Sequence, residues 1–279
     1  MARKRVNSPL KWHGGKHYLA PRIIALMPPH LHYVEPYFGG GHVLFAKDPE
    51  GVSEVVNDID WRLTNFWKCL QCYDCFEQME RGLCVHPVGE AMYRQALRHL
   101  AAGCTNPDGH RAHCQPCAEA FFVVARQSMA GRLGGGWGPL SRTRTRRGMN
   151  EQASAWLGAV EGLPAVAARL LRVVVLNREA PDVIAQQDGE RTCFYLDPPY
   201  LPSTRAAPEV YQHEMTEAQH FDLLEQIKCV KGKVLLSGYR SAMYDDRLAM
   251  WNRHDFVVPN NAAGGDSKRA MTECVWCNF

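Results

Sequence analysis

Residues 32–41 read His-Tyr-Val-Glu-Pro-Tyr-Phe-Gly-Gly-Gly, a short apolar run that ends in three consecutive glycines. The run predicts a β-strand over His32–Pro36, and the glycines predict a tight turn, because glycine adopts backbone conformations that other residues avoid. His42–Lys47 then reads as the start of a helix. A strand, a glycine turn and a helix in this order are typical of α/β sheets that bind ligands at the carboxyl ends of their strands.

Six more β-rich runs follow along the chain, at Val52–Asn57, Arg172–Leu176, Cys193–Leu196, Val234–Ser237, Asp255–Val258 and Cys274–Phe279. Helical patterns lie between several of them, notably at Trp61–Leu70 and Thr216–Val230. This alternation predicts an α/β fold with a mostly parallel sheet and helices on its faces. The last two runs have no helical pattern between them, which allows one of them to run antiparallel.

The middle of the chain has a different character. It contains helical stretches at Glu90–Ala101 and Ala118–Gln127 and seven of the eleven cysteines. We therefore expect one α/β domain, formed by residues 1–67 and 172–279, that is interrupted by a mostly helical insertion, residues 68–171.

Length and composition limit the class of protein. The 279 residues are 46% hydrophobic and 22% charged, with a formal net charge of +3, which excludes a mainly disordered chain. No run of 18 apolar residues is present, so we expect no membrane span. The basic start, MARKRVNSPLKWHGG, has no apolar core behind it. We therefore expect no secretory signal and a cytoplasmic protein.

The cysteines do not predict a disulfide framework, because their number is odd and no secretory signal is expected. Cys72 and Cys75 form one C-x2-C pair, and Cys114 and Cys117 form another. Two such pairs can build a four-cysteine zinc site, but the 38 residues between them exceed the usual separation. We expect dispersed free thiols and no metal site, with zinc as the alternative.

Although the net charge of the whole chain is small, one segment is strongly cationic. Residues 120–150 contain six arginines and no lysine, aspartate or glutamate, a local charge of +6. Such a block on a nearly neutral chain indicates a polyanionic partner. The alternative is a solvated basic loop.

Glu35 to Gly41 and Asp58 form the first candidate site. The glycines allow backbone N–H groups to approach a ligand closely, and Asp58 ends the next predicted strand, where a carboxylate can bind ribose hydroxyls. Together they favour a cofactor that carries a nucleoside. The stretch lacks the G-x-G-x-x-G pattern, which argues against a dinucleotide. A tight turn beside an ordinary surface aspartate is the alternative.

Asp197-Pro198-Pro199-Tyr200 forms the second candidate site, directly after the predicted strand Cys193–Leu196. The prolines stiffen the backbone and remove two N–H donors, which leaves the Asp197 carboxylate and the Pro198 carbonyl as acceptors. Two acceptors beside a tyrosine ring suit an exocyclic amino group on a planar base. A simple strand-ending turn is the alternative.

These residues resemble the Dam-like, alpha-group DNA N6-adenine methyltransferases, which use S-adenosylmethionine. The resemblance rests on four segments in the family's order: Lys11-Trp12-His13-Gly14-Gly15-Lys16, Tyr37-Phe38-Gly39-Gly40-Gly41, Asn57-Asp58-Ile59-Asp60 and Asp197-Pro198-Pro199-Tyr200. Tyr37 replaces the family's leading Phe, and the last segment is unaltered. The resemblance covers nearly the whole chain and is weakest over residues 68–118.

The resemblance implies a Rossmann-like seven-stranded methyltransferase sheet whose last strand is antiparallel, and site-specific N6 methylation of an adenine flipped out of double-stranded DNA. The catalytic residues it implies are Asp197, Pro198, Pro199 and Tyr200. The S-adenosylmethionine-binding residues it implies are Trp12, Lys16, Glu35, Tyr37, Phe38, Gly39, Gly40, Gly41 and Asp58. The DNA-binding residues it implies are Arg126, Arg132, Arg142, Arg144, Arg146 and Arg147, with Arg132 as the base contact because glycines flank it.

Several alternatives stay open at this point. Trp12 can belong to the core, Lys16 can lie at the surface, and Glu35 can cap the helix after the glycine turn. The chain can instead methylate N4 of cytosine, or be a catalytically idle DNA-binding module. We expect a monomer or weak dimer; a role in restriction-modification is compatible with the sequence, and a partner nuclease cannot be inferred from it.

Overall fold

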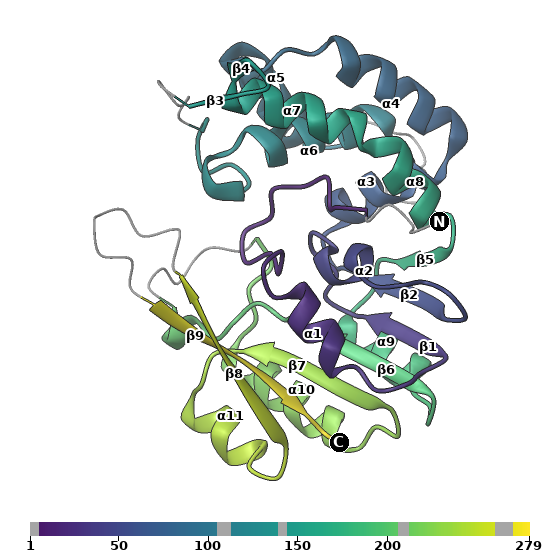
Figure 1. The fold of residues 1–279 in the computed structure, drawn as a ribbon, viewed down its shortest axis with the longest axis vertical. Helices are drawn as coiled ribbons and strands as arrows, with labels where there is room; N and C mark the ends of the chain where they lie inside the picture. The colour runs from purple at the N-terminus through teal and green to yellow at the C-terminus, as the bar shows by residue number, and fades with distance from the viewer. Residues whose placement is uncertain (1–5, 105–112, 139–143, 206–211, 260–269) are drawn as a thin grey trace. The chain divides into compact units, whose positions relative to one another are not determined.

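The structure is a computed structural model that describes residues 6–104, 113–138, 144–205, 212–259 and 270–279 (Figure 1). Contacts divide the chain into two units. The helical unit contains Met1–Ala20, Gly39–Asp48 and Asp60–Val175, and the sheet unit contains Pro21–Phe38, Pro49–Ile59 and Leu176–Phe279. The predicted domain boundaries, after residues 67 and 171, divide the sequence at two positions, whereas each of these units is defined by contacts among three separate segments. The predicted domain division therefore stays a prediction.

Seven strands form one sheet in the order β5-β2-β1-β6-β7-β9-β8. The strands are β1 (His32–Glu35), β2 (Ser53–Asn57), β5 (Val173–Leu176), β6 (Thr192–Leu196), β7 (Lys233–Gly238), β8 (Asn252–Pro259) and β9 (Ala270–Cys277). β1 pairs in parallel with β2 and β6, β6 pairs in parallel with β7, and β9 is antiparallel to both β7 and β8. All seven predicted runs are strands. The mixed α/β fold class is confirmed and is consistent with a Rossmann-like methyltransferase.

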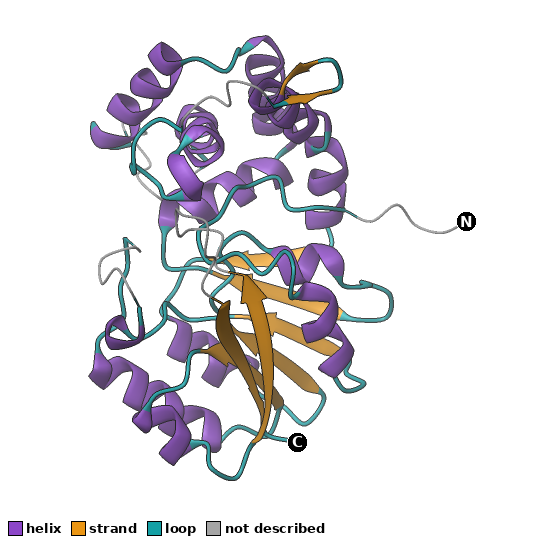
Figure 2. Cartoon of the chain, turned by 60° about the vertical axis from the view of Figure 1, so that its left-hand side comes forward, coloured by secondary structure: helices purple, strands orange, loops and turns teal. Residues whose placement is uncertain are grey.

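The sheet is covered on both faces, as Figure 2 shows. Helices α9 (Ala180–Gln187), α10 (Glu217–Lys228) and α11 (Ala242–Arg247) contribute to one core cluster with residues of β1, β6 and β7. Helix α1 (Ala20–Leu26) lies on the opposite face. All five residues of β6 are buried, as expected of a parallel strand between two helical layers.

The helical unit is built around α6 (Gln115–Gln127), in which nine residues are buried. Its other described elements are α2 (His42–Ala46), α3 (Trp61–Gln71), α4 (Tyr73–Val85), α5 (Glu90–Ala101), η2 (Met129–Gly131), β3 (Thr145–Arg146), β4 (Met149–Asn150), α7 (Glu151–Glu161) and α8 (Leu163–Leu170). Phe122 of α6 stacks on Phe66 of α3, with ring centroids 5.6 Å apart, and it also contacts Trp156 of α7. An apolar helix at the centre of a bundle is buried on every side, which explains the apolar sequence of α6.

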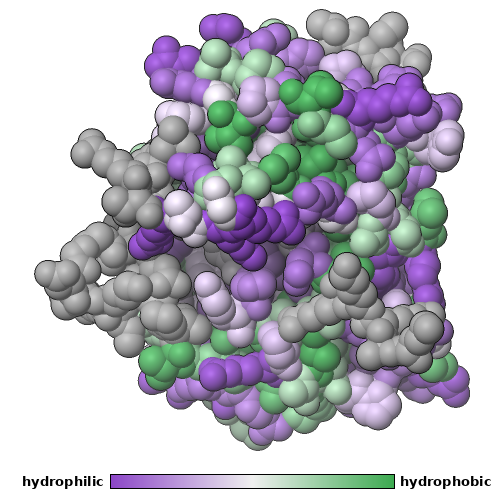
Figure 3. Space-filling model, turned by 45° about the horizontal axis from the view of Figure 1, so that its top comes forward, coloured by the Kyte–Doolittle hydropathy of each residue, from purple (hydrophilic) through white to green (hydrophobic). Residues whose placement is uncertain are grey.

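Among the described residues, no helix combines the length and the apolar character that a membrane span requires. Hydrophilic and hydrophobic residues are interspersed on the face shown in Figure 3. Single exposed hydrophobic residues such as Met250 are ordinary at a protein surface.

Candidate active site

Three acidic residues of the sheet unit stand where neighbouring parallel strands end. Glu35 is the last residue of β1, Asp58 follows β2 and Asp197 follows β6. β1 lies between the other two strands, so the three acids line one edge of the sheet. The strand order also reverses direction between β1 and β6, which is where open α/β sheets bind their ligands.

Asn57 ties these strand ends together. Its side-chain amide donates to the carbonyls of Pro36 and Arg178, each at 3.0 Å, and its Oδ1 accepts from the Arg178 N–H at 2.9 Å. Its own carbonyl accepts from the Phe38 N–H at 2.8 Å. Asn57 is 1% exposed, so one desolvated side chain fixes the segments that leave β1, β2 and β5. Asp58, the predicted ribose acceptor, follows it directly and is half-buried.

Glu35 is also buried at the end of its strand. Burial, followed by the nearby carboxylate of Glu35, raises the pKa of Tyr33 well above its ordinary value. Tyr33 and Glu35 are two residues apart on β1 and therefore share one face of the strand. The N-cap of α2 is Gly41, which has no side chain of its own, and the alternative in which Glu35 caps that helix stays open.

The glycine turn has the backbone that its sequence predicts. Gly39 has φ +50° and Gly41 has φ +67°, and Gly41 is the N-cap of α2. Phe38, before the turn, is buried, and Tyr37 packs against the core cluster of the sheet unit. Both aromatic residues therefore have packing roles, whatever they contact in a bound cofactor.

Trp12 lies on the glycine turn within the helical unit. A Cβ added at Gly39 would be 2.7 Å from Trp12 Nε1, and one added at Gly40 would be 2.8 Å from Trp12 Cβ. The turn therefore requires glycine because the indole occupies the space of a side chain. Trp12 is only half-buried, and its ring centroid is 6.3 Å from that of Phe121.

His42, the first residue of α2, contacts the same N-terminal segment. Its ring would collide with a Cβ added at Gly15 or at Gly40. Burial, aided by His17 and Lys16, lowers the pKa of His42 to about 4, so its imidazole is neutral at pH 7. Lys16 is buried, and its Nζ donates to the Gly14 carbonyl at 2.8 Å. The alternative in which Lys16 is a surface lysine is therefore wrong.

The Asp197–Tyr200 segment presents a half-buried carboxylate and a buried phenol. The Tyr200 hydroxyl donates to a carboxylate oxygen of Glu273, and its ring meets Tyr239 edge-on with centroids 4.8 Å apart. Burial raises the pKa of Tyr200 well above its ordinary value, and the negative charge of Asp197 and then of Glu273 raises it further. The phenol therefore stays protonated and acts as a fixed donor between two acids.

Glu273 contacts the candidate site and was not predicted from the sequence. It lies on β9, is 7% exposed, and is 73 residues beyond its partner Tyr200. The only available signal was an acidic residue beside a strongly apolar strand run.

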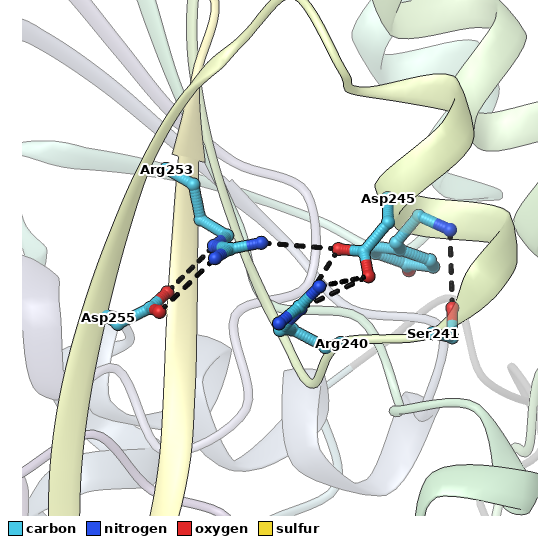
Figure 4. A network of polar contacts seen from close by, with 6 residues as sticks. Arg240, Ser241, Asp245, Arg253 and Asp255 are labelled. Carbon is cyan, nitrogen blue, oxygen red and sulfur yellow. Dashed lines mark hydrogen bonds and ion pairs between the residues drawn. The ribbon is translucent and has the colours of Figure 1, made fainter.

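An ionic network holds the segment that carries Tyr239 (Figure 4). Arg240, the next residue, donates to Asp245 at 2.9 Å, and Arg253 of β8 lies 3.4 Å from Asp245 and 2.9 Å from Asp255. The Ser241 hydroxyl caps α11. Arg240 and Asp255 are exposed, so solvent screens these pairs and each contributes little to stability. The network orients the chain after β7 more than it stabilises the sheet unit.

His220 of α10 lies beside the Asp197–Tyr200 segment within the sheet unit. It is fully buried, and its Nδ1 lies 2.9 Å from the Tyr244 hydroxyl. Burial and the positive charge of Arg205 lower the pKa of His220 to about 4, while the nearby Pro199 backbone opposes them. A neutral histidine therefore stands next to the Pro-Pro step.

The predicted DNA-binding arginines have different surroundings. Arg126 donates to the carbonyls of Ala155 at 2.7 Å and Pro9 at 3.3 Å, and burial lowers its pKa to about 10. These contacts favour a structural role for Arg126, and its DNA contact stays a prediction. Arg132 is exposed and follows Gly131, whose φ is +71°. Arg142 lies outside the described residues.

The last three arginines lie on a β-hairpin. β3 and β4 pair antiparallel, and the turn between them, Arg147-Gly148, has φ values of 54° and 70°. Two residues with positive φ are typical of the tight turn that matches strand twist. Arg144, Arg146 and Arg147 are exposed, and Arg147 forms an ion pair with Glu161 at 3.1 Å.

Two comparisons with known proteins agree with this fold. Residues 12–84 match the family model of the D12 class N6 adenine-specific DNA methyltransferases, and this segment contains Trp12, Lys16, the glycine turn and Asp58. The chain is also 25% identical over 291 residues to the Type II methyltransferase M1.LlaDCHI of Lactococcus lactis subsp. cremoris, an alignment that covers 96% of this chain and 94% of the relative. Together they support an enzyme that methylates N6 of adenine in DNA, and methyl transfer implies a methyl donor and a DNA substrate.

Proposed function

We propose that the chain is a Dam-like, alpha-group enzyme that transfers a methyl group from S-adenosylmethionine to N6 of an adenine flipped out of double-stranded DNA. The observation that carries the proposal is Asp197-Pro198-Pro199-Tyr200 at the end of β6, one strand from the buried Glu35 of β1. An amino-group acceptor and a strand-end acid thus belong to the same edge of one sheet.

The residues present fit a methyl donor that carries a nucleoside. Glu35 and Asp58 end adjacent parallel strands, so two carboxylates are available for an amino group and for ribose hydroxyls. In this proposal Lys16 faces the donor's carboxylate, and Trp12 and the glycine turn Gly39–Gly41 contact its apolar part. S-adenosylmethionine, when bound, supplies a methyl group that its sulfonium has already activated.

The residues of this chain have to make the N6 amino group of adenine a better nucleophile. Its lone pair is delocalised into the ring, so the free amino group is a poor nucleophile. Hydrogen bonds from the amino group to the Asp197 carboxylate and the Pro198 carbonyl favour a tetrahedral nitrogen with a localised lone pair. Both acceptors are held in place before the substrate binds. The site therefore does not have to rearrange its polar groups during the reaction, which lowers the activation barrier.

Tyr200 positions the base. A base within a duplex cannot reach the two acceptors, so it has to be extruded, and an aromatic ring then stabilises it by about 1–3 kcal/mol. The hydrogen bond to Glu273 and the edge contact with Tyr239 fix the Tyr200 ring in advance. A fixed ring orders the incoming base at a smaller entropic cost.

The exposed arginines are the proposed DNA contacts. Arg132 is proposed to reach base edges, and the hairpin residues Arg144, Arg146 and Arg147 are proposed to neutralise phosphates. Arg126 is not among them, because its guanidinium donates to the internal carbonyls of Pro9 and Ala155. We propose a role in restriction-modification because the relative is a Type II methyltransferase.

Methylation of N4 of cytosine is the second candidate, since that amino group is chemically similar. Asp197 opposes it, because enzymes of that class more often carry serine before Pro-Pro. An idle binding module is opposed by the intact Asp-Pro-Pro-Tyr and glycine turn.

The direct test uses unmethylated double-stranded DNA and S-adenosylmethionine labelled in its methyl group, followed by digestion to nucleosides. We expect the label in N6-methyladenine, and none with the Asp197→Ala variant. Label in N4-methylcytosine would replace the proposal with the second candidate. DNA binding without any labelled nucleoside would favour the idle module.

A further inference from the structure

Three cysteines of the helical unit converge at one end of the α5–α6 pair. The Sγ atoms of Cys104, Cys114 and Cys117 all lie within 4.8 Å of one another. Cys104 follows α5, Cys114 is the N-cap of α6, and Cys117 lies in the first turn of α6. Within the described ranges, this is the one group of three histidine, cysteine or acidic residues with metal-binding geometry.

A histidine stands beside these thiols. His99 lies in the last turn of α5, and its Nε2 is 3.5 Å from the Sγ of Cys117. In a tetrahedral zinc site, bonds of about 2.3 Å to sulfur and about 2.0 Å to nitrogen place the two ligand atoms about 3.5 Å apart. The separation of Cys117 and His99 fits two ligands of the same ion, but His99 is not within 4.8 Å of all three thiols, so its ring has to turn towards them when the ion binds.

The backbone of the site is already fixed by a buried amide. Asn65 of α3 donates to the Cys114 carbonyl and accepts from the Cys114 N–H, both at 2.9 Å. The side chain of Asn65 is buried, so it holds the start of α6 without help from solvent. Supporting hydrogen bonds of this kind orient the ligands of metal sites.

We propose that Cys104, Cys114, Cys117 and His99 bind one structural zinc ion. The spacing is H-x4-C-x9-C-x2-C, in which the second C-x2-C pair of the sequence takes part and Cys72 and Cys75 do not. On binding, three S–H bonds break, three S–Zn bonds and one N–Zn bond form, and three protons pass to solvent. No redox step is involved. Four protein ligands leave no open position, so the ion is structural.

The ion would link helices α5 and α6 at the end where the three cysteines lie. At the other end of the two helices, the Tyr93 hydroxyl lies 3.1 Å from the Ser128 hydroxyl, and the Gly89 N–H donates to Gln127 at 3.3 Å. Zinc would join the C-terminal end of α5 to the N-terminal end of α6. Helix α6 leads through Ser128 to Arg132, so the ion stiffens the base of the loop proposed to bind DNA. The zinc site itself does not depend on the proposed methylation.

The test begins with the wild-type chain and zinc alone. We expect one zinc per purified chain by elemental analysis, loss of zinc with a chelator, and a lower Tm for the metal-free form. Cobalt(II) added to that form should give the intense visible bands of a tetrahedral ion and thiolate-to-cobalt charge transfer. A wild-type chain that binds neither ion at stoichiometric concentration, or that gives an octahedral cobalt spectrum, would overturn the proposal. So would a disulfide among the three cysteines in protein purified without reductant.

Variants then assign the ligands. Cys114→Ser and Cys117→Ser should lose the zinc, and His99→Ala should weaken binding at least about tenfold. Cys84→Ser is the matched control, because Cys84 is an exposed cysteine of the same insertion, and it should keep the full zinc content. Zinc retained in both Cys114→Ser and Cys117→Ser would exclude this site. Zinc retained in His99→Ala but lost in Cys75→Ser would exclude His99 as the fourth ligand. If the cysteine variants do not fold, the wild-type cobalt spectrum decides.

Discussion

The sheet unit and the helical unit place their functional polar groups differently. In the sheet unit, Glu35, Asn57 and Glu273 are between 1% and 7% exposed at or beside strand ends. In the helical unit, Arg132 and the hairpin arginines are exposed above a core of stacked aromatic rings. Buried hydrogen bonds give the precise geometry that chemistry requires, whereas phosphate binding requires accessible charge. Substitutions in the two units should therefore affect turnover and DNA binding separately.

The largest expected effect is that of Asp197→Ala in the sheet unit. The variant loses the charged acceptor for the adenine amino group, so kcat should fall at least about 10³-fold. Binding of S-adenosylmethionine, measured by calorimetry, and Tm should stay close to those of the wild type. Loss of cofactor binding in a folded variant would contradict the separation of chemistry from cofactor binding. Asp197→Asn retains one acceptor and should keep more activity.

Asn57→Ala should have the next largest effect, on stability. It removes three buried hydrogen bonds, and each buried partner left unsatisfied costs about 1–3 kcal/mol. The free energy of unfolding in urea should fall by at least about 2 kcal/mol. Asn177→Ala is the matched control, since its amide is exposed and donates to the Asp58 and Ile59 carbonyls. Equal losses in the two variants would contradict the role of Asn57 in joining the strand ends.

Tyr200→Phe keeps the stacking ring and removes the hydrogen bond to Glu273. We expect a loss of about 1–3 kcal/mol in unfolding free energy and a fall in kcat with little change in KM for the cofactor. Glu273→Gln retains an acceptor for the Tyr200 hydroxyl and should be milder on both measures. If Tyr200→Phe has wild-type kcat, the bond to Glu273 does not position the ring.

Among the described residues, each unit has one histidine whose pKa is strongly lowered, His42 in the helical unit and His220 in the sheet unit. Their folded-state pKa values are about 4 against an ordinary value of 6.5, so below pH 6.5 the unfolded chain takes up protons that the folded chain does not. Their stabilising contributions are complete above pH 6.5 and are lost as the pH falls toward 4. Urea unfolding across this range should give a flatter pH dependence for His220→Gln than for the wild type. An unchanged slope would show that His220 is protonated in the folded chain.

Arg132→Ala should have the smallest effect and should act on DNA binding alone. Loss of one phosphate contact lowers the slope of log K against log salt by about 1, and loss of a base contact lowers discrimination between sites. At saturating DNA, kcat should be close to that of the wild type. Arg94→Ala is the matched control, an exposed arginine of α5 that pairs with Glu90. The same salt slope for both variants would remove Arg132 from the DNA contacts.

The strands were predictable because each is a short apolar run bounded by turn residues, and all seven runs became strands. The acidic residues of the candidate site were predictable as strand-end residues where a motif ends a strand, as at Asp197 and Asp58. Charge alone did not distinguish Arg126, whose guanidinium binds two internal carbonyls, from Arg132, which is exposed. Both are arginines of one cationic block, and only their neighbours differ.

By itself, the sequence determined the order of strands and helices, the glycine turn and the two acceptor-bearing segments, because these depend on residues close together in the chain. Only the tertiary structure decided that Glu273 meets Tyr200 and that Cys104 joins Cys114 and Cys117 while Cys72 and Cys75 do not. Those partners come from separate strands or helices. Their meeting depends on sheet order and helix packing, which no local pattern of residues encodes.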